Sequence, residues 1–283
     1  MVHFDEGLAR RDSSFSPCGR AKDDSMIFWL ESQSTEIISL VVFGFIYLAA
    51  AIIFLVVVQA SRASVKEELR TVTPGVLSPL GAILGIMIAF LAARVWANVD
   101  RAEEYVTQEM SALRQAALIV KSLSPDVRDR FRAGIKEHLK FIVFDEWPAM
   151  SKERATLGSN PAPLEDAMNA LLSFSPSQTN EQLAQSRALI SAEEALKYRR
   201  YRVWLSQAKI EPIQWIVICL VAALIMVTIA AIHVEKKWAM ATSLFAFSSA
   251  IAICLVLLLD YDHPFGRGDF SIMPTQYIEA MPN

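Results

Sequence analysis

The chain has 283 residues, of which 53% are hydrophobic and 20% are charged, and its formal net charge is -3 at pH 7. A mean hydropathy of +0.33 is too high for an ordinary soluble domain, so the composition excludes that class. Lys and Arg are scattered along a nearly neutral chain, which excludes a nucleic-acid surface. The three cysteines have neither metal-binding nor redox spacing, and we expect no disulfide.

The first 25 residues combine charge and serine with few large apolar side chains, which predicts a disordered tail. This tail lacks the apolar core of a secretory signal, so we expect the first spanning helix to direct insertion, with Met26 as an alternative start. Trp29 follows, either at the membrane interface or in an extension of the first helix.

Four long apolar runs lie two on each side of a polar middle. Each holds about 18 to 22 residues without a formal charge, the length at which an α-helix crosses hydrocarbon. Because a backbone in lipid must satisfy its own hydrogen bonds, these runs are expected to be helices. The runs cover 37–58, 76–93, 213–232 and 238–259.

Basic residues near the ends of the spans predict the orientation. They are more frequent beside the central segment and the chain ends than beside the two short loops, so both termini are expected in the cytoplasm of a bacterial inner membrane. The expected divisions are a tail over 1–25, two spans over 26–97, a cytoplasmic helical region over 98–211, two spans over 212–260 and a cytoplasmic tail over 261–283.

The second span is expected to continue into the cytoplasm as one helix. Beyond it, apolar residues recur at spacings of three and four, which indicates one buried helix face. The members of this stripe are Val106, Met110, Leu113, Ala117 and Val120.

The rest of the middle is predicted to be helical as well. Ser124 and Pro125 are expected to begin a helix, with the serine side chain as its cap, and Trp147-Pro148 to end it. Trp147 is interpreted as an anchor in the core or at a subunit interface. A short helix is expected over 164–172, and Thr179 with Gln182 fits a capping box that opens the last helix of the middle.

No enzyme signature is present. The sequence has no Gly-rich phosphate loop, no HExxH and no nucleophile motif, and its four histidines lie far apart. We therefore expect neither catalysis nor a cofactor.

Two segments indicate a family. Residues 78–100 resemble the pore-lining helix of bestrophins, with Pro79, Leu84-Gly85, Arg94, Trp96 and Asn98 in similar order. After the fourth span, DHPFGRGDF resembles the bestrophin Asn-Pro-Phe-Gly motif and its acidic tail. With its two-plus-two span layout, the chain is similar to the bestrophin-like family of bacterial membrane proteins.

The resemblance implies an all-α homopentamer around a central pore. Alignment on Pro79 and Arg94 puts the neck at Ser78, Ala82 and Ile86, or at Phe90 instead. Two of the first three are small, so a gate that works by shedding water from an apolar ring is expected to differ here. Equally, Ala82 and Ile86 could pack helix against helix.

The second segment implies less about metal binding. The motif Pro264-Phe265-Gly266 is followed by only one acid, Asp269. A calcium clasp at this place needs several carboxylates. We expect no metal, and we interpret the acids around the motif as turn formers.

Basic residues at the mouth leave alternatives open. Arg94 either attracts anions or fixes the helix at the mouth of the pore, or it only snorkels or pairs with an acid such as Asp100. The basic run 197–202 either meets anionic lipid or draws anions into a vestibule.

The leading hypothesis is an oligomeric channel for inorganic ions in the lipid bilayer, pentameric and with anions slightly preferred. The alternative is a non-conducting membrane scaffold or sensor that binds a partner through its cytoplasmic helices. Neither hypothesis involves nucleic acid.

Overall fold

The structure, a computed structural model, describes residues 35–60, 74–152, 154–157, 161–266 and 271–281. All regular elements within these ranges are helical. The predicted tail, Met26, Trp29 and most of the loop between the first two spans lie outside the described residues. The elements are α2 (Thr35–Ala60), η1 (Pro74–Val76), α4 (Leu77–Ile119), η2 (Val120–Ser122), α5 (Pro125–Phe141), η3 (Ile142–Glu146), α6 (Trp147–Met150), α7 (Ala162–Leu172), α8 (Thr179–Leu205), α9 (Pro212–Ile232), α10 (Lys237–Tyr261) and α11 (Thr275–Ala280).

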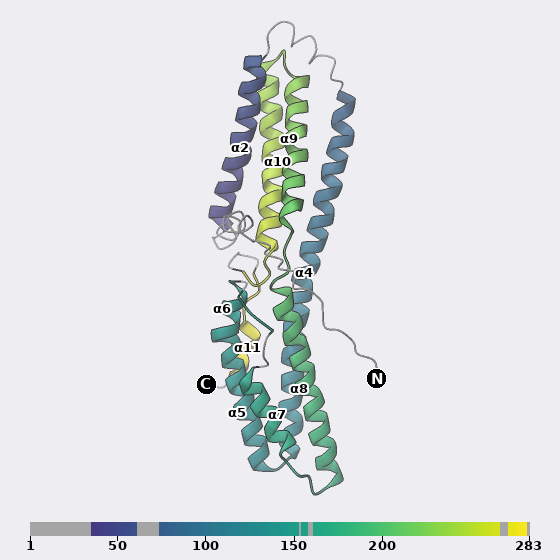
Figure 1. The fold of residues 1–283 in the computed structure, drawn as a ribbon, viewed down its shortest axis with the longest axis vertical. Helices are drawn as coiled ribbons and strands as arrows, with labels where there is room; N and C mark the ends of the chain where they lie inside the picture. The colour runs from purple at the N-terminus through teal and green to yellow at the C-terminus, as the bar shows by residue number, and fades with distance from the viewer. Residues whose placement is uncertain (1–34, 61–73, 153, 158–160, 267–270, 282–283) are drawn as a thin grey trace, which may run out of the picture.

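The chain forms an elongated rod with two regions (Figure 1). In the membrane region, α2, α9 and α10 lie beside the first half of α4. The second half of α4, with α5 to α8 and α11, forms what we call the extramembrane region. Four of the described helices, α2, α4, α9 and α10, are long and apolar enough to cross a bilayer. The predicted all-α membrane fold with four spans and a helical region is confirmed.

Helix α4 belongs to both regions. Its 43 residues form one continuous helix, about 65 Å long at 1.5 Å per residue. We take its membrane-spanning part as residues 77–93, because charged side chains begin at Arg94. In the extramembrane part, Val106, Met110, Leu113 and Val120 are buried as predicted, whereas Ala117 is only half-buried. Helix α8 packs along this face.

The extramembrane helices enclose a core of their own. The apolar stripe of α5 is buried at Val127, Phe131, Ile135 and Leu139, and Ile142 of η3 continues it. Helix α7 crosses α5 closely at Gly134, where a Cβ would lie 2.7 Å from the Cβ of Ala167. Trp147 is buried in the same core, as predicted for an anchor.

Three local predictions were wrong. Ser124 precedes α5 but makes no side-chain capping bond. Pro148 does not end its helix, because the chain passes through the π-helix η3 and the proline then falls in the first turn of α6, where its missing N–H is tolerated. The capping box of α8 lies one residue earlier than expected, with Gln178 as cap and the Glu181 carboxylate accepting the Gln178 N–H at 3.3 Å.

Candidate functional site

The predicted neck residues lie along an exposed side of α4. Ser78, Ala82, Ile86 and Phe90 are all exposed in the single chain, with exposed fractions of 56% for Ile86 and 73% for Phe90. Figure 1 shows this half of α4 at the edge of the membrane region. None of the residues that the structure describes covers the side that the resemblance assigns to the pore.

A different side of α4 holds it to its own chain. Leu84, Leu91 and Val95 are buried in the core that α4 shares with α2, α9 and α10. A Cβ added at Gly81 or Gly85 would meet nothing within 4 Å in the part of the chain that the structure describes. The span of α4 therefore has a narrow packed side and a broad unpacked surface.

The three residues predicted at the pore mouth have different environments. Arg94 is exposed, and its Nη2 donates a hydrogen bond to the Lys209 carbonyl at 3.3 Å. Trp96 is exposed and Asn98 is buried. Arg94 thus contacts the connection between α8 and α9, rather than forming the ion pair with Asp100 that was one alternative.

The same connection is held from the end of α10. Both carboxylate oxygens of Asp262 accept the Ile210 backbone N–H, at 3.0 and 3.1 Å. Burial raises the pKa of Asp262, against the lowering effects of His263 and this hydrogen bond. Asp262 therefore ties two distant segments at the membrane boundary, whereas the sequence suggested a local turn. The described residues contain no group of three potential metal ligands.

The Pro-Phe-Gly motif turns the chain into the extramembrane core. Phe265 is buried, and its ring meets the Trp147 ring edge-on at a centroid distance of 5.3 Å. The Gly266 N–H donates to the His263 carbonyl at 3.0 Å, which closes a tight turn around Pro264. The predicted site residue Asp269 lies outside the described residues.

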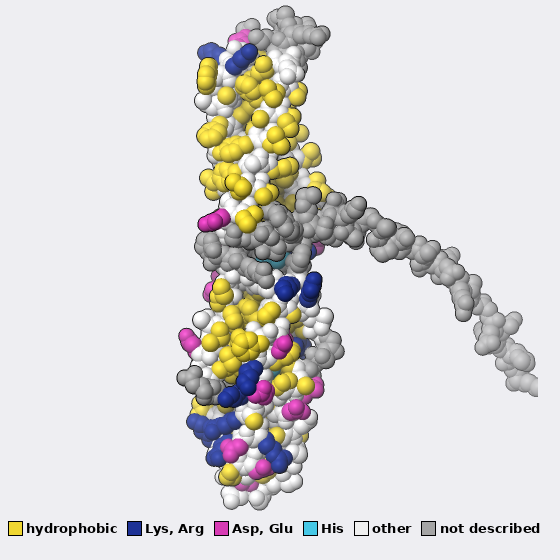
Figure 2. All heavy atoms as spheres, turned by 90° about the vertical axis from the view of Figure 1, so that its left-hand side faces the viewer, with side chains coloured by type: hydrophobic (Ala, Val, Ile, Leu, Met, Phe, Trp, Pro, Cys, Tyr) yellow, Lys and Arg dark blue, Asp and Glu magenta, His cyan; other side chains and the backbone are white. Residues whose placement is uncertain are grey.

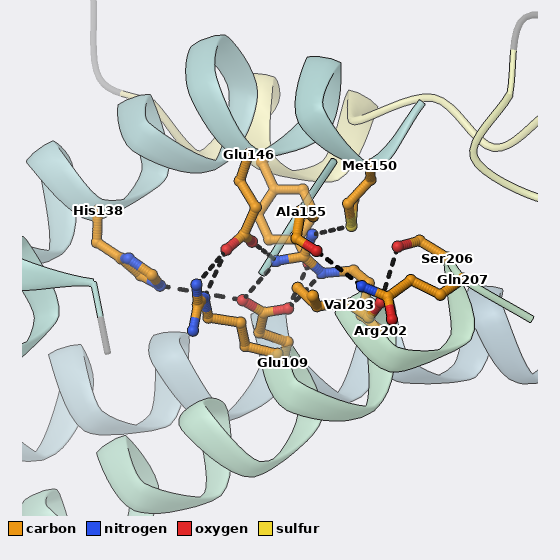
Figure 3. Close-up of polar contacts among 11 residues, drawn as sticks. Glu109, His138, Glu146, Met150, Ala155, Arg202, Val203, Ser206 and Gln207 are labelled. Carbon is orange, nitrogen blue, oxygen red and sulfur yellow. Dashed lines mark hydrogen bonds and ion pairs between the residues drawn. The ribbon is translucent and has the colours of Figure 1, made fainter. Parts of the chain in front are cut away.

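A buried charge cluster joins the extramembrane helices (Figure 3). We define it as Glu109 of α4, Glu146 of η3, and Arg199 and Arg202 of α8. Arg202 donates from Nε to Glu109 Oε2 at 2.8 Å and from Nη2 to Glu146 Oε1 at 2.6 Å. Arg199 Nε donates to Glu146 Oε2 at 2.6 Å. Two acids and two bases give a cluster without net charge, the condition under which buried ions are tolerated.

Arg202 is the centre of this cluster. Its side chain is fully buried, and its guanidinium lies 5.5 Å from the centroids of both the Trp147 and Tyr277 rings. Nη1 donates to the Met150 sulfur at 3.2 Å, and the Tyr277 hydroxyl donates to Glu109 Oε2 at 2.9 Å. The Arg202 side chain is thus held by hydrogen bonds and cation–π contacts from residues of α4, η3, α6 and α11.

Burial changes the acid–base behaviour of these groups. It raises the pKa of Glu109, although the positive charge of Arg202 opposes this. His138 is fully buried beside the cluster, with Nε2 3.9 Å from Glu109 Oε1, and neither ring nitrogen has a hydrogen-bond partner among the described residues. Burial, with the charges of Arg202 and Arg199, lowers the pKa of His138 to about 3, so the ring is neutral near pH 7.

A bestrophin-like domain matches residues 44–277. The chain belongs to the bestrophin-like family. No curated protein matches the chain.

Solved structures show the same fold. A mutant crystal structure of a bacterial bestrophin homologue from Klebsiella pneumoniae aligns with a TM-score of 0.63 at 14% identity, over 84% of this chain and 96% of that chain. The structure of the Klebsiella pneumoniae homologue that was phased with zinc aligns with a TM-score of 0.63 at 13% identity, over 84% of this chain and 94% of that chain. The crystal structure of another mutant of that homologue aligns with a TM-score of 0.62 at 15% identity, over 86% of this chain and 94% of that chain. At such identity the likeness establishes the bestrophin fold alone.

The buried charge cluster escaped the sequence reasoning. The basic run 197–202 was assigned to lipid or a vestibule, but Arg199 and Arg202 point into the protein and only Arg200 among its arginines is exposed. One signal was available, since Glu109 lies between Val106 and Met110 on the apolar side of α4. A charge on a buried helix face requires a buried partner.

Proposed function

We propose that several copies of this chain, five by the resemblance, assemble into an ion channel whose pore is lined by α4. The carrying observation is the unpacked surface of the α4 span, with Ser78, Ala82, Ile86 and Phe90 exposed in the single chain. Membership of the bestrophin-like family supports the same arrangement. A ring of identical copies covers one side of each α4 with its neighbour and leaves another side to water.

The neck of this channel is proposed to be wide at one end and narrow at the other. Ser78 and Ala82 carry small side chains, while Ile86 and Phe90 are large and apolar. Large apolar rings gate by dewetting. The constriction is therefore assigned to Ile86 and Phe90, in the half of the span next to the extramembrane region.

We propose a slight preference for anions. Arg94 supports it, because this exposed cation lies where α4 leaves the membrane. Arg199 and Arg202 make no contribution, since Glu146 and Glu109 neutralise them. Substitution of Arg94 by Gln is expected to shift the reversal potential in a chloride gradient towards that of cations. An unchanged potential removes Arg94 as the source of the preference.

Orientation follows from the same proposal. Both termini and the extramembrane region are assigned to the cytoplasm of the bacterial inner membrane, because the basic residues lie mainly on that side. Protease added to intact spheroplasts is expected to leave the extramembrane region uncut. Cleavage there without lysis reverses the orientation.

Liposome flux and native mass spectrometry together test the channel. Five copies per particle and a flux that changes with Ile86→Ala are expected, with Ile88→Ala, on the packed side of α4, as the matched control. Monomers or dimers alone contradict the pentamer, and a protein without flux contradicts the channel.

A non-conducting scaffold or sensor is the second candidate. It is favoured by exposed apolar side chains on α8 in the extramembrane region, at Leu183, Ile190 and Trp204, which lie 7 and 14 residues apart. Such a stripe suits a partner helix. In a conducting channel the same stripe is available to a neighbouring copy, so flux decides between the two candidates.

A further inference from the structure

An apolar groove opens between three membrane helices. It has a volume of about 250 Å³ and lies between α2, α9 and α10. Its lining includes Val42 and Ile46 of α2, Trp215 and Cys219 of α9, and Leu255 and Leu259 of α10.

The lining restricts what can occupy the groove. It presents apolar surface alone, so ions, headgroups and polar metabolites have no hydrogen-bond partner there. The volume exceeds the roughly 150 Å³ of a cavity that takes a benzene ring and falls short of the roughly 300 Å³ at which drug-sized pockets begin. A neighbouring helix, about 10 to 12 Å across, is too wide to enter. A thin, flexible hydrocarbon chain fits.

The groove lies where the acyl chains of one membrane leaflet can reach it. Trp215 lies in the first turn of α9, and Leu259 lies near the end of α10, so the groove occupies the half of the membrane next to the extramembrane region. Phe45, also in the lining, is 61% exposed at the surface of α2. Figure 2, viewed from the α2 side, shows apolar side chains over this part of the molecule.

Polar groups mark the outer limit of the groove. Thr35 Oγ1 donates to Asp260 Oδ1 at 2.9 Å, between the start of α2 and the end of α10. Along the chain, this bond lies six residues before Val41 and one residue after Leu259, towards the extramembrane end of both helices. Trp215 has the aromatic character of residues at that interface. A chain that enters from the lipid surface thus passes from polar surroundings into a purely apolar slot.

We infer that this groove binds an acyl chain of a membrane lipid from the leaflet next to the extramembrane region. The inference requires only that α2, α9 and α10 span the membrane, and it holds whether or not the protein conducts ions.

Photolabelling tests the site. The full chain is reconstituted in phosphatidylglycerol vesicles that contain a lipid with a diazirine in its acyl chain, and labelled residues are mapped by mass spectrometry. Labels are expected to concentrate on the groove residues of α2, α9 and α10. Cys219→Leu narrows the groove and is expected to reduce this labelling several-fold. Cys254→Leu is the matched control, because Cys254 is a similarly half-buried cysteine of α10 outside the groove, and it is expected to leave labelling unchanged.

A second measurement avoids any substitution that fills the groove. Vesicles of brominated phosphatidylglycerol are expected to quench Trp215 strongly, measured as the fluorescence difference between the native chain and Trp215→Phe. Even labelling along the whole outer surface of α2, including Leu48 and Leu55, overturns the inference. So does a Trp215 that bromine does not quench, or crosslinks from the groove to a second copy of the chain.

Discussion

The two regions of this molecule solve opposite problems with the same kind of helix. In the membrane region, large apolar side chains such as Leu40, Leu48 and Trp238 face outwards, because the surrounding lipid accepts them. In the extramembrane region the interior contains two acids and two arginines joined in three ion pairs, and a neutral histidine. The membrane region therefore depends on its surroundings for shape, and the extramembrane region depends on a specific internal network.

Loss of Arg202 is expected to lower the free energy of unfolding more than any other change considered, because the extramembrane region depends on its internal network. Arg202→Met leaves Glu109 and Glu146 buried without their shared partner, which costs about 3 to 5 kcal/mol. Arg200→Met, two residues along α8 and exposed, is the matched control and is expected to cost about 0.5 kcal/mol or less. Chemical unfolding of the detergent-solubilised protein, followed by circular dichroism, measures both. Equal effects of the two changes contradict the network.

Removal of one hydroxyl is the next test. Tyr277→Phe keeps the ring beside Arg202 but removes the hydrogen bond to Glu109. Because a hydrogen bond to a charged group contributes about 1.5 to 3 kcal/mol, the free energy of unfolding is expected to fall by that amount. Tyr201→Phe, on the exposed side of α8, is expected to change the free energy of unfolding little. Hydrogen exchange should also rise in α11. A protected α11 in Tyr277→Phe shows that other contacts hold the C-terminal helix.

The fold was largely predictable and the cluster was not, for physical reasons. Span length and an apolar helix side are local properties, so the four spans and the stripe ending at Val120 were visible in the sequence. The cluster joins residues 53, 56 and 93 positions apart, and such pairing depends on how helices cross. The π-helix that brings Glu146 to Arg199 has no simple sequence signature either.

Acid is expected to weaken the extramembrane region through His138. Its pKa is about 3 in the folded protein and about 6.5 in an unfolded chain, so between these values only the unfolded chain binds the proton. The free energy of unfolding therefore falls as pH drops from 6.5 towards 3, and this group contributes a loss of about 2 kcal/mol at pH 5. His138→Leu is expected to remove that part of the slope. His233→Leu, at the end of α9, serves as control, and identical pH profiles of His138→Leu and the native chain refute the assignment.

Two glycines sharpen the contrast in packing. Gly134→Ala places a methyl group 2.7 Å from the Ala167 Cβ and 2.9 Å from the Pro163 carbonyl oxygen. Overpacking of this kind lowers the free energy of unfolding by about 1 to 3 kcal/mol, and we expect a value near the lower limit because α5 and α7 need to separate only slightly. Gly44→Ala in α2 meets nothing and is expected to be neutral or slightly stabilising. Thermal unfolding of the two variants compares them, and an equally tolerated Gly134→Ala shows that α7 is loosely held.

Cysteine accessibility along α4 tests the central claim most directly. In a chain whose native cysteines are replaced by serine, single cysteines are placed from 78 to 91 and exposed in native oligomers to a membrane-impermeant thiol reagent. A water-filled passage predicts reaction at Ser78, Ala82 and Ile86 and protection at Leu84 and Leu91. Protection at every position of a folded, native assembly contradicts a pore lined by α4.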